Sequence, residues 1–106
     1  MSELIVMLCT VPSYEDGTKI AQKLVQEELA ACVNMTGSVS SIYKWKGEIC
    51  SDDEYILIIK TKSELLDKIK EEIISLHPYE LPEIISLPIS DGLEPYLQWI
   101  RDNTIK

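Results

Sequence analysis

The segment 32–62 predicts a long β-hairpin, and this constrains the fold more than any other feature of the sequence. Gly47 lies near its middle and favours a turn, while Thr36 and Gly37 favour a bulge or bend. Each strand then has about 15 residues, or roughly 50 Å at the usual rise per residue. The first apolar run, Leu4–Val11, reaches only about 26 Å. We therefore expect the hairpin to extend well beyond the sheet that it shares with this run.

The outer part of this hairpin carries two large aromatic side chains, Tyr43 and Trp45. A free two-stranded ribbon cannot bury such rings and is marginally stable in water. Unpaired strand edges also favour pairing with another chain. The sequence therefore predicts a homo-oligomer in which each hairpin packs on a neighbouring copy. The alternative is a hairpin that folds back over its own sheet, which a bend at Gly37 would permit.

The whole chain, 1–106, predicts one domain in which strands and helices alternate. Its elements are a strand at 4–11, a helix at 14–29, the hairpin, a helix at 63–76, a strand at 84–89 and a short helix that opens at 91–95. The order βαββαβ is that of the ferredoxin-like split βαβ fold, an α+β sandwich. In this chain the central hairpin is extended, and the C-terminal helix is an addition to the ferredoxin-like fold.

The charge balance excludes several kinds of partner. Ten basic residues against eighteen acidic ones give a net charge of −8 and a pI near 4.5. Binding to nucleic acid or to anionic membranes needs a basic face, so neither is expected. The longest apolar run is far shorter than a membrane span, and no basic segment of a signal peptide precedes it. We expect a soluble, cytoplasmic protein.

Three scattered cysteines and one histidine are the candidate soft metal ligands. No C-x-x-C pair is present, so a zinc ribbon or a thioredoxin-type site is not indicated. Cys32 follows two alanines at the foot of a strand, and we expect it to be buried and structural. Cys50 is placed on the hairpin, where it can approach a neighbouring subunit.

The predicted topology brings Cys9 and His77 to one edge of the sheet, because the first strand and the second helix both end there. The loop that follows can add Glu80 or Glu83. A thiolate and an imidazole suit copper or zinc, although two ligands alone make a weak site. Two other interpretations stay open: a buried apolar role for Cys9, and a helix-end imidazole that interacts with the helix dipole for His77.

A run of acids in the hairpin is a second place to look for a cation site. Asp52, Asp53 and Glu54 follow one another in a strand, so their side chains alternate between faces and do not converge. We expect a solvated edge there.

Five blocks of the sequence stand in order: Leu29–Asn34, Ser41–Glu48, Ile59–Thr61, His77–Ile84 and Tyr96–Ile100. Through these blocks the chain resembles the divalent-cation tolerance (CutA) family over nearly its whole length. The resemblance implies a compact homotrimer of ferredoxin-like subunits that is linked to tolerance of copper and other divalent cations, without an established catalytic reaction.

The resemblance also implies a copper site at a cysteine before Thr-x-Pro and at two histidines before Pro-Tyr. Cys9 and His77 match these positions, whereas Leu76 stands where the family has the first histidine. We therefore expect weak Cu²⁺ or Zn²⁺ binding by Cys9 and His77, with Glu83 as the added oxygen ligand.

Two enzymatic functions are not favoured by the sequence. A phosphate-binding enzyme on this scaffold would need an arginine-bearing loop after the first strand, but the single arginine is Arg101. A cysteine hydrolase would need an orienting group and an oxyanion hole, and neither can be placed. The alternative to metal binding is a trimeric scaffold or small-anion sensor, which would use clefts between subunits, the first helix N-terminus and Lys60 or Lys62.

Overall fold

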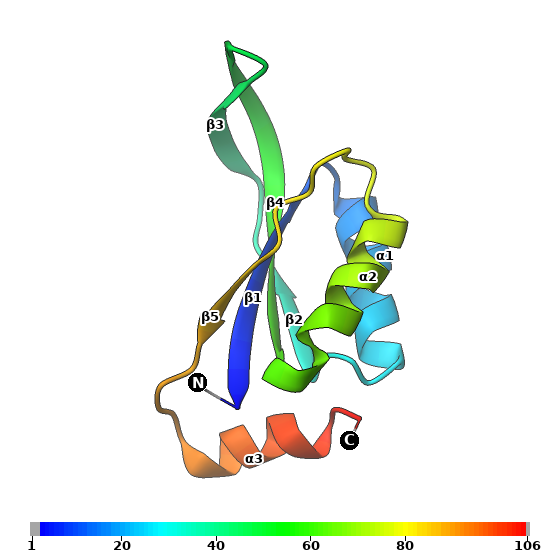
Figure 1. The fold of residues 1–106 in the computed structure, drawn as a ribbon, viewed down its shortest axis with the longest axis vertical. Coiled ribbons are helices and arrows are strands. Elements are labelled where there is room, and N and C mark those ends of the chain that lie inside the picture. The colour runs from blue at the N-terminus through cyan, green and yellow to red at the C-terminus, as the bar shows by residue number, and fades with distance from the viewer. Residues whose placement is uncertain (1–2, 106) are drawn as a thin grey trace.

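The computed structural model describes residues 3–105 and has the expected ferredoxin-like α+β architecture (Figure 1). Its elements are β1 (Leu4–Val11), α1 (Tyr14–Gln26), β2 (Cys32–Met35), β3 (Val39–Trp45), β4 (Glu48–Lys62), the 3-10 turn η1 (Ser63–Leu65), α2 (Leu66–Leu76), β5 (Ile85–Pro88) and α3 (Glu94–Asp102). Both α1 and α2 lie on the same face of the sheet, and α3 lies across its end.

The sheet is antiparallel in the order β2-β4-β1-β5, and β3 continues along the same edge of β4 as β2. The last pair between β1 and β4 is Val11 with Tyr55, so among the described strands residues 48–54 of β4 pair with β3 alone. We call residues 39–54 the arm. It projects past the body of the molecule, which measures 44 × 25 × 24 Å with the arm included. The hairpin therefore extends outward and does not fold back over its own sheet.

The core lies between the sheet and the two long helices. Alternate strand residues point into it from the sheet, and the fully buried ones include Met7, Cys9, Val11, Leu57 and Ile59. The helices contribute the fully buried residues Ile20, Leu24, Ile69 and Ile73. The apolar residues that predicted the strands and the apolar residues that predicted the helices thus pack together in one cluster.

The other face of the sheet is also apolar. The strand register places Val6, Leu8, Ile56, Ile58, Ile85 and Leu87 on it, and we call these residues the open face. Ile85 and Leu87 are about half exposed, at 50% and 49%. Neither α1 nor α2 lies on this face, and α3 lies at one end of it (Figure 1).

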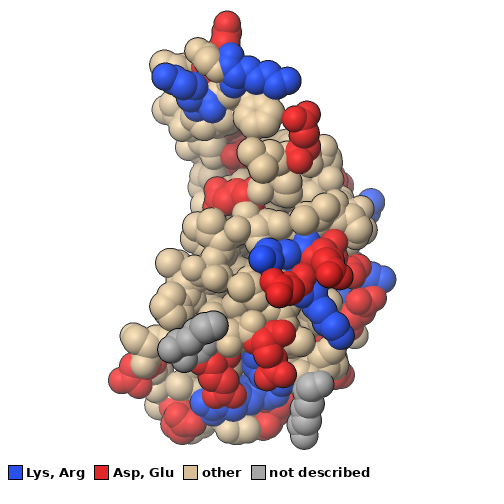
Figure 2. Space-filling model, viewed as in Figure 1, with Lys and Arg blue, Asp and Glu red and all other residues tan. Residues whose placement is uncertain are grey.

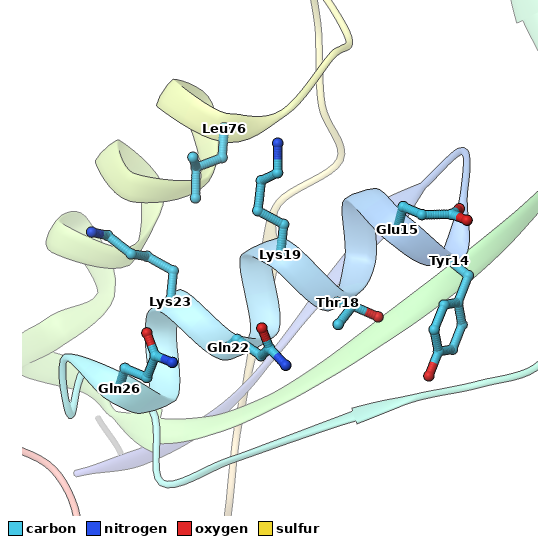
Figure 3. A pocket seen from close by; sticks show the side chains of 8 residues that line it. All are labelled: Tyr14, Glu15, Thr18, Lys19, Gln22, Lys23, Gln26 and Leu76. Atoms are coloured by element: carbon cyan, nitrogen blue, oxygen red, sulfur yellow. The ribbon is translucent and has the colours of Figure 1, made fainter.

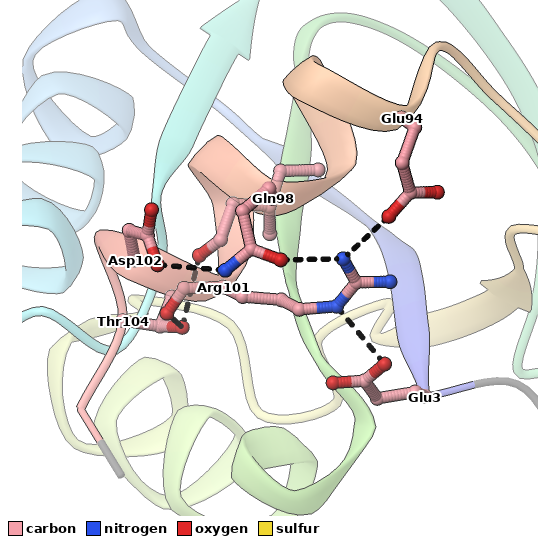
Figure 4. A network of polar contacts seen from close by, with 7 residues as sticks. Glu3, Glu94, Gln98, Arg101, Asp102 and Thr104 are labelled. Atoms are coloured by element: carbon pink, nitrogen blue, oxygen red, sulfur yellow. Dashed lines mark hydrogen bonds and ion pairs between the residues drawn. The ribbon is translucent and has the colours of Figure 1, made fainter.

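Helix α3 is attached to the end of the sheet by packing and by polar contacts. Ile100 packs against Leu4 and Ala31 in a small second cluster. Arg101 binds the Glu3 carboxylate at 3.1 Å and the Glu94 carboxylate at 3.0 Å (Figure 4). None of the described helices is long and apolar enough to cross a membrane.

Three element boundaries differ from the sequence prediction. Helix α1 ends at Gln26 because Glu28 adopts a left-handed conformation (φ 58°), and the Leu29 N–H then donates to the Leu24 carbonyl. The second helix begins with a 3-10 turn, η1. Strand β5 covers Ile85–Pro88 rather than 84–89, since its pairing with β1 spans four residues.

Cys32 is half-buried rather than buried. It begins β2, the edge strand, which has a neighbouring strand on one side only among residues 3–105. The expectation of a fully enclosed thiol at this position was wrong.

Candidate functional site

Cys9 and His77 lie at the same edge of the sheet and contact the same backbone oxygen. The His77 Nε2 atom is 2.7 Å from the Thr10 carbonyl oxygen, and the Cys9 Sγ atom is 3.8 Å from it. Thr10 lies in β1, and His77 is the C-cap of α2, so the topology sets this meeting point. The predicted proximity of these two residues is thus a feature of the fold.

Both ring nitrogens of His77 are used inside the chain. Nδ1 accepts the backbone N–H of Tyr79 at 3.1 Å. A carbonyl oxygen can only accept, so Nε2 must carry the proton and donate it to Thr10. The imidazole is 8% exposed, and its ring lies 4.8 Å from the Tyr79 ring, centre to centre. These contacts hold the loop after α2 against the end of β1.

The Cys9 side chain is fully buried in the core. Burial raises the pKa of the Cys9 thiol to about 12, and the negative charges of Glu83 and Glu54 add to this effect. The side chain is therefore a protonated thiol at neutral pH. A metal needs the thiolate, so ligation by Cys9 requires the loss of a tightly held proton.

Cys9 and His77, as they are arranged in the folded chain, do not present ligands to a copper or zinc ion. Neither ring nitrogen of His77 has a free lone pair, and the thiol is enclosed. Glu83 is exposed on the loop, and its carboxylate is hydrogen-bonded to neither of them. Across residues 3–105, no group of three or more His, Cys, Asp or Glu side chains is arranged to hold a metal ion.

A groove lies beside this edge, between the arm and the loop after α2. We call it the acidic groove; its volume is about 970 Å³. Its lining residues are Thr10, Ser41, Ile42, Tyr43, Trp45, Glu54, Pro78, Tyr79, Glu80, Leu81, Pro82, Glu83, Ile84 and Ile85. Three of these are glutamates and none is a lysine or arginine. In Figure 2, the basic side chains in view gather at the end of the arm and over the lower body of the molecule.

Glu54 is the central polar residue of this groove. The Tyr79 hydroxyl donates to its Oε2 atom at 2.7 Å, which ties the loop to β4. Burial and this bond to a carboxylate raise the pKa of Tyr79 above its usual value. Further out on the arm, the Tyr43 hydroxyl donates to Asp52, and this bond raises the pKa of Tyr43 to about 12.

The role of Glu54 was not predicted from the sequence. We interpreted Asp52, Asp53 and Glu54 together as a solvated edge, and the two aspartates are exposed as expected. Glu54 is buried, because it lies at the junction between the arm and β1 and is covered by Tyr79. Two features of the sequence could have indicated its burial. Successive strand residues point to opposite faces, so Glu54 faces away from Asp53, and a tyrosine stands in the loop expected nearby.

A second pocket, of about 570 Å³, runs along α1 (Figure 3). Helix α1 supplies its lining apart from Leu76 of α2. Thr18 is one of the lining residues. Its Oγ1 atom is the one buried side-chain oxygen or nitrogen in residues 3–105 without a hydrogen-bond partner.

The residues considered for an anion site do not come together in one chain. The α1 N-terminus is capped by Ser13, whose Oγ accepts the Asp16 N–H at 3.1 Å. Lys60 and Lys62 pair with the opposite end of β1, near Leu4. Lys60 instead lies over the Tyr96 ring, with Nζ 5.8 Å from the ring centre.

Known proteins resemble this chain over nearly its full length. The CutA1 divalent ion tolerance protein family matches residues 5–103. The divalent-cation tolerance protein CutA of Thermus thermophilus is 50% identical over 99 residues, which are 93% of this chain and 96% of that protein. The chloroplastic CutA of Arabidopsis thaliana is 46% identical over 100 residues, and this chain spans only 55% of its length.

Solved structures agree with these sequence matches. The divalent cation tolerance protein from Thermus thermophilus superposes with a TM-score of 0.93 at 48% identity, covering 95% of this chain and 98% of that one. CutA1 from a psychrotrophic Shewanella species gives 0.96 at 40% identity, covering 99% of this chain and 98% of that one. The likeness extends over nearly the whole chain, and on this ground the chain belongs to the CutA1 divalent ion tolerance protein family.

Proposed function

We propose that this chain acts in divalent-cation tolerance as a non-catalytic homotrimer that binds Cu²⁺ or Zn²⁺ weakly. The matched family and the Thermus thermophilus relative carry divalent ion or cation tolerance in their names. The main support for the homotrimer is that residues 3–105 have both a projecting arm and an apolar sheet face that is partly exposed. A protonated, buried Cys9 thiol is a poor nucleophile, which supports a role other than catalysis.

Two surfaces support self-association. On the arm, Ile42 is 74% exposed and Ile49 78%, and the Trp45 ring is also partly exposed. On the body, the open face leaves Ile85 and Leu87 half exposed. Apolar patches of this kind on a small protein are typical of interfaces. A neighbouring copy supplies both a surface for the arm and a cover for the open face.

Sedimentation equilibrium at micromolar concentration tests the assembly. We expect the mass of three chains of 12.1 kDa. Trp45→Ala should weaken the association by about 3–5 kcal/mol, the scale for truncating a large buried aromatic. A wild-type protein that sediments as a monomer would rule out the trimer. Trp45→Ala that leaves the association constant unchanged would show that the arm does not form the interface.

The metal proposal rests on Cys9 and His77 meeting at Thr10, with Glu83 on the adjoining loop. Binding must break the two hydrogen bonds of the imidazole and remove the thiol proton, and both steps cost free energy. We therefore expect affinity well below that of a four-ligand site. Acidification should weaken binding further, because a protonated imidazole cannot ligate.

Anaerobic titration of the metal-free protein with Cu²⁺ and Zn²⁺, followed by calorimetry, tests this proposal. His77→Ala and Cys9→Ser should each reduce binding, and Glu83→Gln should reduce it less. Cys32→Ser is the matched control, because this thiol begins the edge strand β2, away from the Thr10 carbonyl. If the His77 and Cys9 variants titrate like wild type, these residues are not the site.

A cytoplasmic location is part of the same proposal. All three cysteines are free thiols, and Cys32 and Cys50 are only half-buried. Accessible unpaired thiols are typical of reducing compartments.

A further inference from the structure

We propose that Asp91 and Gly92 form a modification site, at which the chain rearranges spontaneously to isoaspartate through a cyclic succinimide. Both residues are exposed in the loop 89–93, which connects β5 to α3 (Figure 1). They belong neither to the arm nor to the open face, so the surfaces assigned to the assembly do not include them. This modification goes beyond divalent-cation tolerance and does not rest on it.

The Asp91 carboxyl group lies against the backbone nitrogen that attacks it in this reaction. The Gly92 N–H donates to Asp91 Oδ1 at 2.8 Å, in a loop that is neither helix nor strand. A bond from this nitrogen to Asp91 Cγ closes the five-membered succinimide ring, so the hydrogen bond already brings the two ends of the ring together. Groups that are held together react much faster than groups that must first meet. Gly92 also has no side chain to shield its nitrogen.

The rearrangement needs only the chain and water. The Gly92 nitrogen bonds to Asp91 Cγ, the C–OH bond of the protonated carboxyl group breaks, and the hydroxyl leaves with the amide hydrogen as water. A second water molecule then adds to the main-chain carbonyl carbon of Asp91. The bond from that carbon to nitrogen breaks, and the nitrogen takes a hydrogen from this water. The main chain now runs through Cβ and Cγ, is one methylene longer, and carries the former main-chain carbonyl as a free carboxyl group.

A second Asp-Gly pair in the chain, Asp16 and Gly17, is held in a way that prevents the same reaction. The Gly17 N–H donates to the Ser13 carbonyl at 3.1 Å within α1, and the Ser13 hydroxyl donates to the Asp16 carboxylate at 2.9 Å. Gly17 is buried, and a Cβ atom there would lie 2.5 Å from Met35 Sδ, so the surroundings leave no room for the ring. The fold therefore selects one of two identical dipeptides.

The first turn of α3 depends on the position of this loop. The N–H groups of Tyr96 and Leu97 donate to the Leu93 carbonyl at 2.9 and 3.0 Å, and Leu93 follows the site directly. A Cβ atom on Gly92 would lie 3.0 Å from the Leu97 side chain, so the loop packs closely against the helix. An added methylene in the main chain displaces the loop from the helix. Isoaspartate at position 91 therefore loosens the start of α3.

Incubation of the folded protein in warm, mildly acidic buffer over weeks tests the site. The readouts are peptide mapping by mass spectrometry with electron-transfer fragmentation, and labelling by a carboxyl methyltransferase that recognises isoaspartyl residues. We expect roughly tenfold more conversion at Asp91 than at Asp16, because only Asp91 is oriented for ring closure. Asp91→Glu should abolish the labelling, since it demands a six-membered ring. Asp16→Glu is the matched control and should leave the labelling unchanged.

The same chain unfolded in guanidinium chloride is the reference, because there the dipeptide sequence alone sets the rate, and both pairs should convert alike. Equal conversion at Asp91 and Asp16 in the folded protein would overturn the proposal, as would labelling that survives Asp91→Glu. In the converted fraction, hydrogen exchange at the Tyr96 and Leu97 amides should be faster than in the unconverted protein. Unchanged exchange at these amides would show that the modification does not loosen α3.

Discussion

Cys9 and Tyr79 are both held in their neutral forms by the folded chain. Burial is the main cause of the raised pKa in each case, and the charge of Glu54 contributes to both. A raised pKa in the folded state means that the unfolded chain releases these protons at lower pH. Their stabilising effect is therefore complete below the unfolded values, about 8.5 for a thiol and 10 for a phenol, and is lost as pH rises.

This predicts an alkaline loss of stability that depends on Tyr79. In urea unfolding between pH 8 and pH 11, the midpoint should fall as pH rises, and the fall above about pH 10 should be shallower in Tyr79→Phe. Tyr14→Phe is the control, because the Tyr14 ring is 58% exposed and its hydroxyl bonds no carboxylate in residues 3–105. Equal slopes for Tyr79→Phe and wild type would contradict the role given to the Glu54 contact.

At the scale of elements, the end of α1 contains strain that a substitution can relieve. Glu28 has φ 58°, the left-handed region, where a side chain costs roughly 1–2 kcal/mol and glycine costs nothing. Glu28→Gly should raise the free energy of unfolding by about 0.5–1 kcal/mol, after its added unfolded-state entropy is counted. Urea unfolding at fixed protein concentration measures this.

The neighbouring residue is the matched control. Glu27 has φ −88°, so glycine relieves nothing there, and its ion pair with Lys23 at 2.7 Å is lost. Glu27→Gly should therefore lower stability. If both variants shift the unfolding midpoint in the same direction, backbone strain at Glu28 is not the reason for the effect.

The elements also differ in how far the sequence could predict them. The arm followed from strand lengths, since a 15-residue β4 cannot pair fully with an 8-residue β1. The meeting of Cys9 and His77 followed from topology alone. The end of α1 could not be predicted from the sequence, because Glu28 adopts a conformation that sequence patterns assign to glycine. The burial of Glu54 could not be predicted either, since it depends on where Tyr79 docks.

At the scale of the whole molecule, the two faces of the sheet have different surroundings. One face is covered by α1 and α2, while the open face has an apolar surface that residues 3–105 leave partly exposed. Leaving this surface in water forfeits about 25 cal/mol for each Å² of apolar area. A second copy recovers that free energy, and this is a physical reason to expect assembly independently of any ligand.

A lysine placed on each face of the subunit in turn locates the interface. Leu87→Lys puts a charge on the open face, where Leu87 is 49% exposed, and should convert the assembly to monomers, because a buried unpaired ammonium is costly. Ile74→Lys makes the same kind of change on α2, where Ile74 is 61% exposed, and should leave the assembly intact. Sedimentation velocity distinguishes the species, and circular dichroism confirms that both variants fold. Dissociation by Ile74→Lys rather than Leu87→Lys would place the subunit interface on the helices.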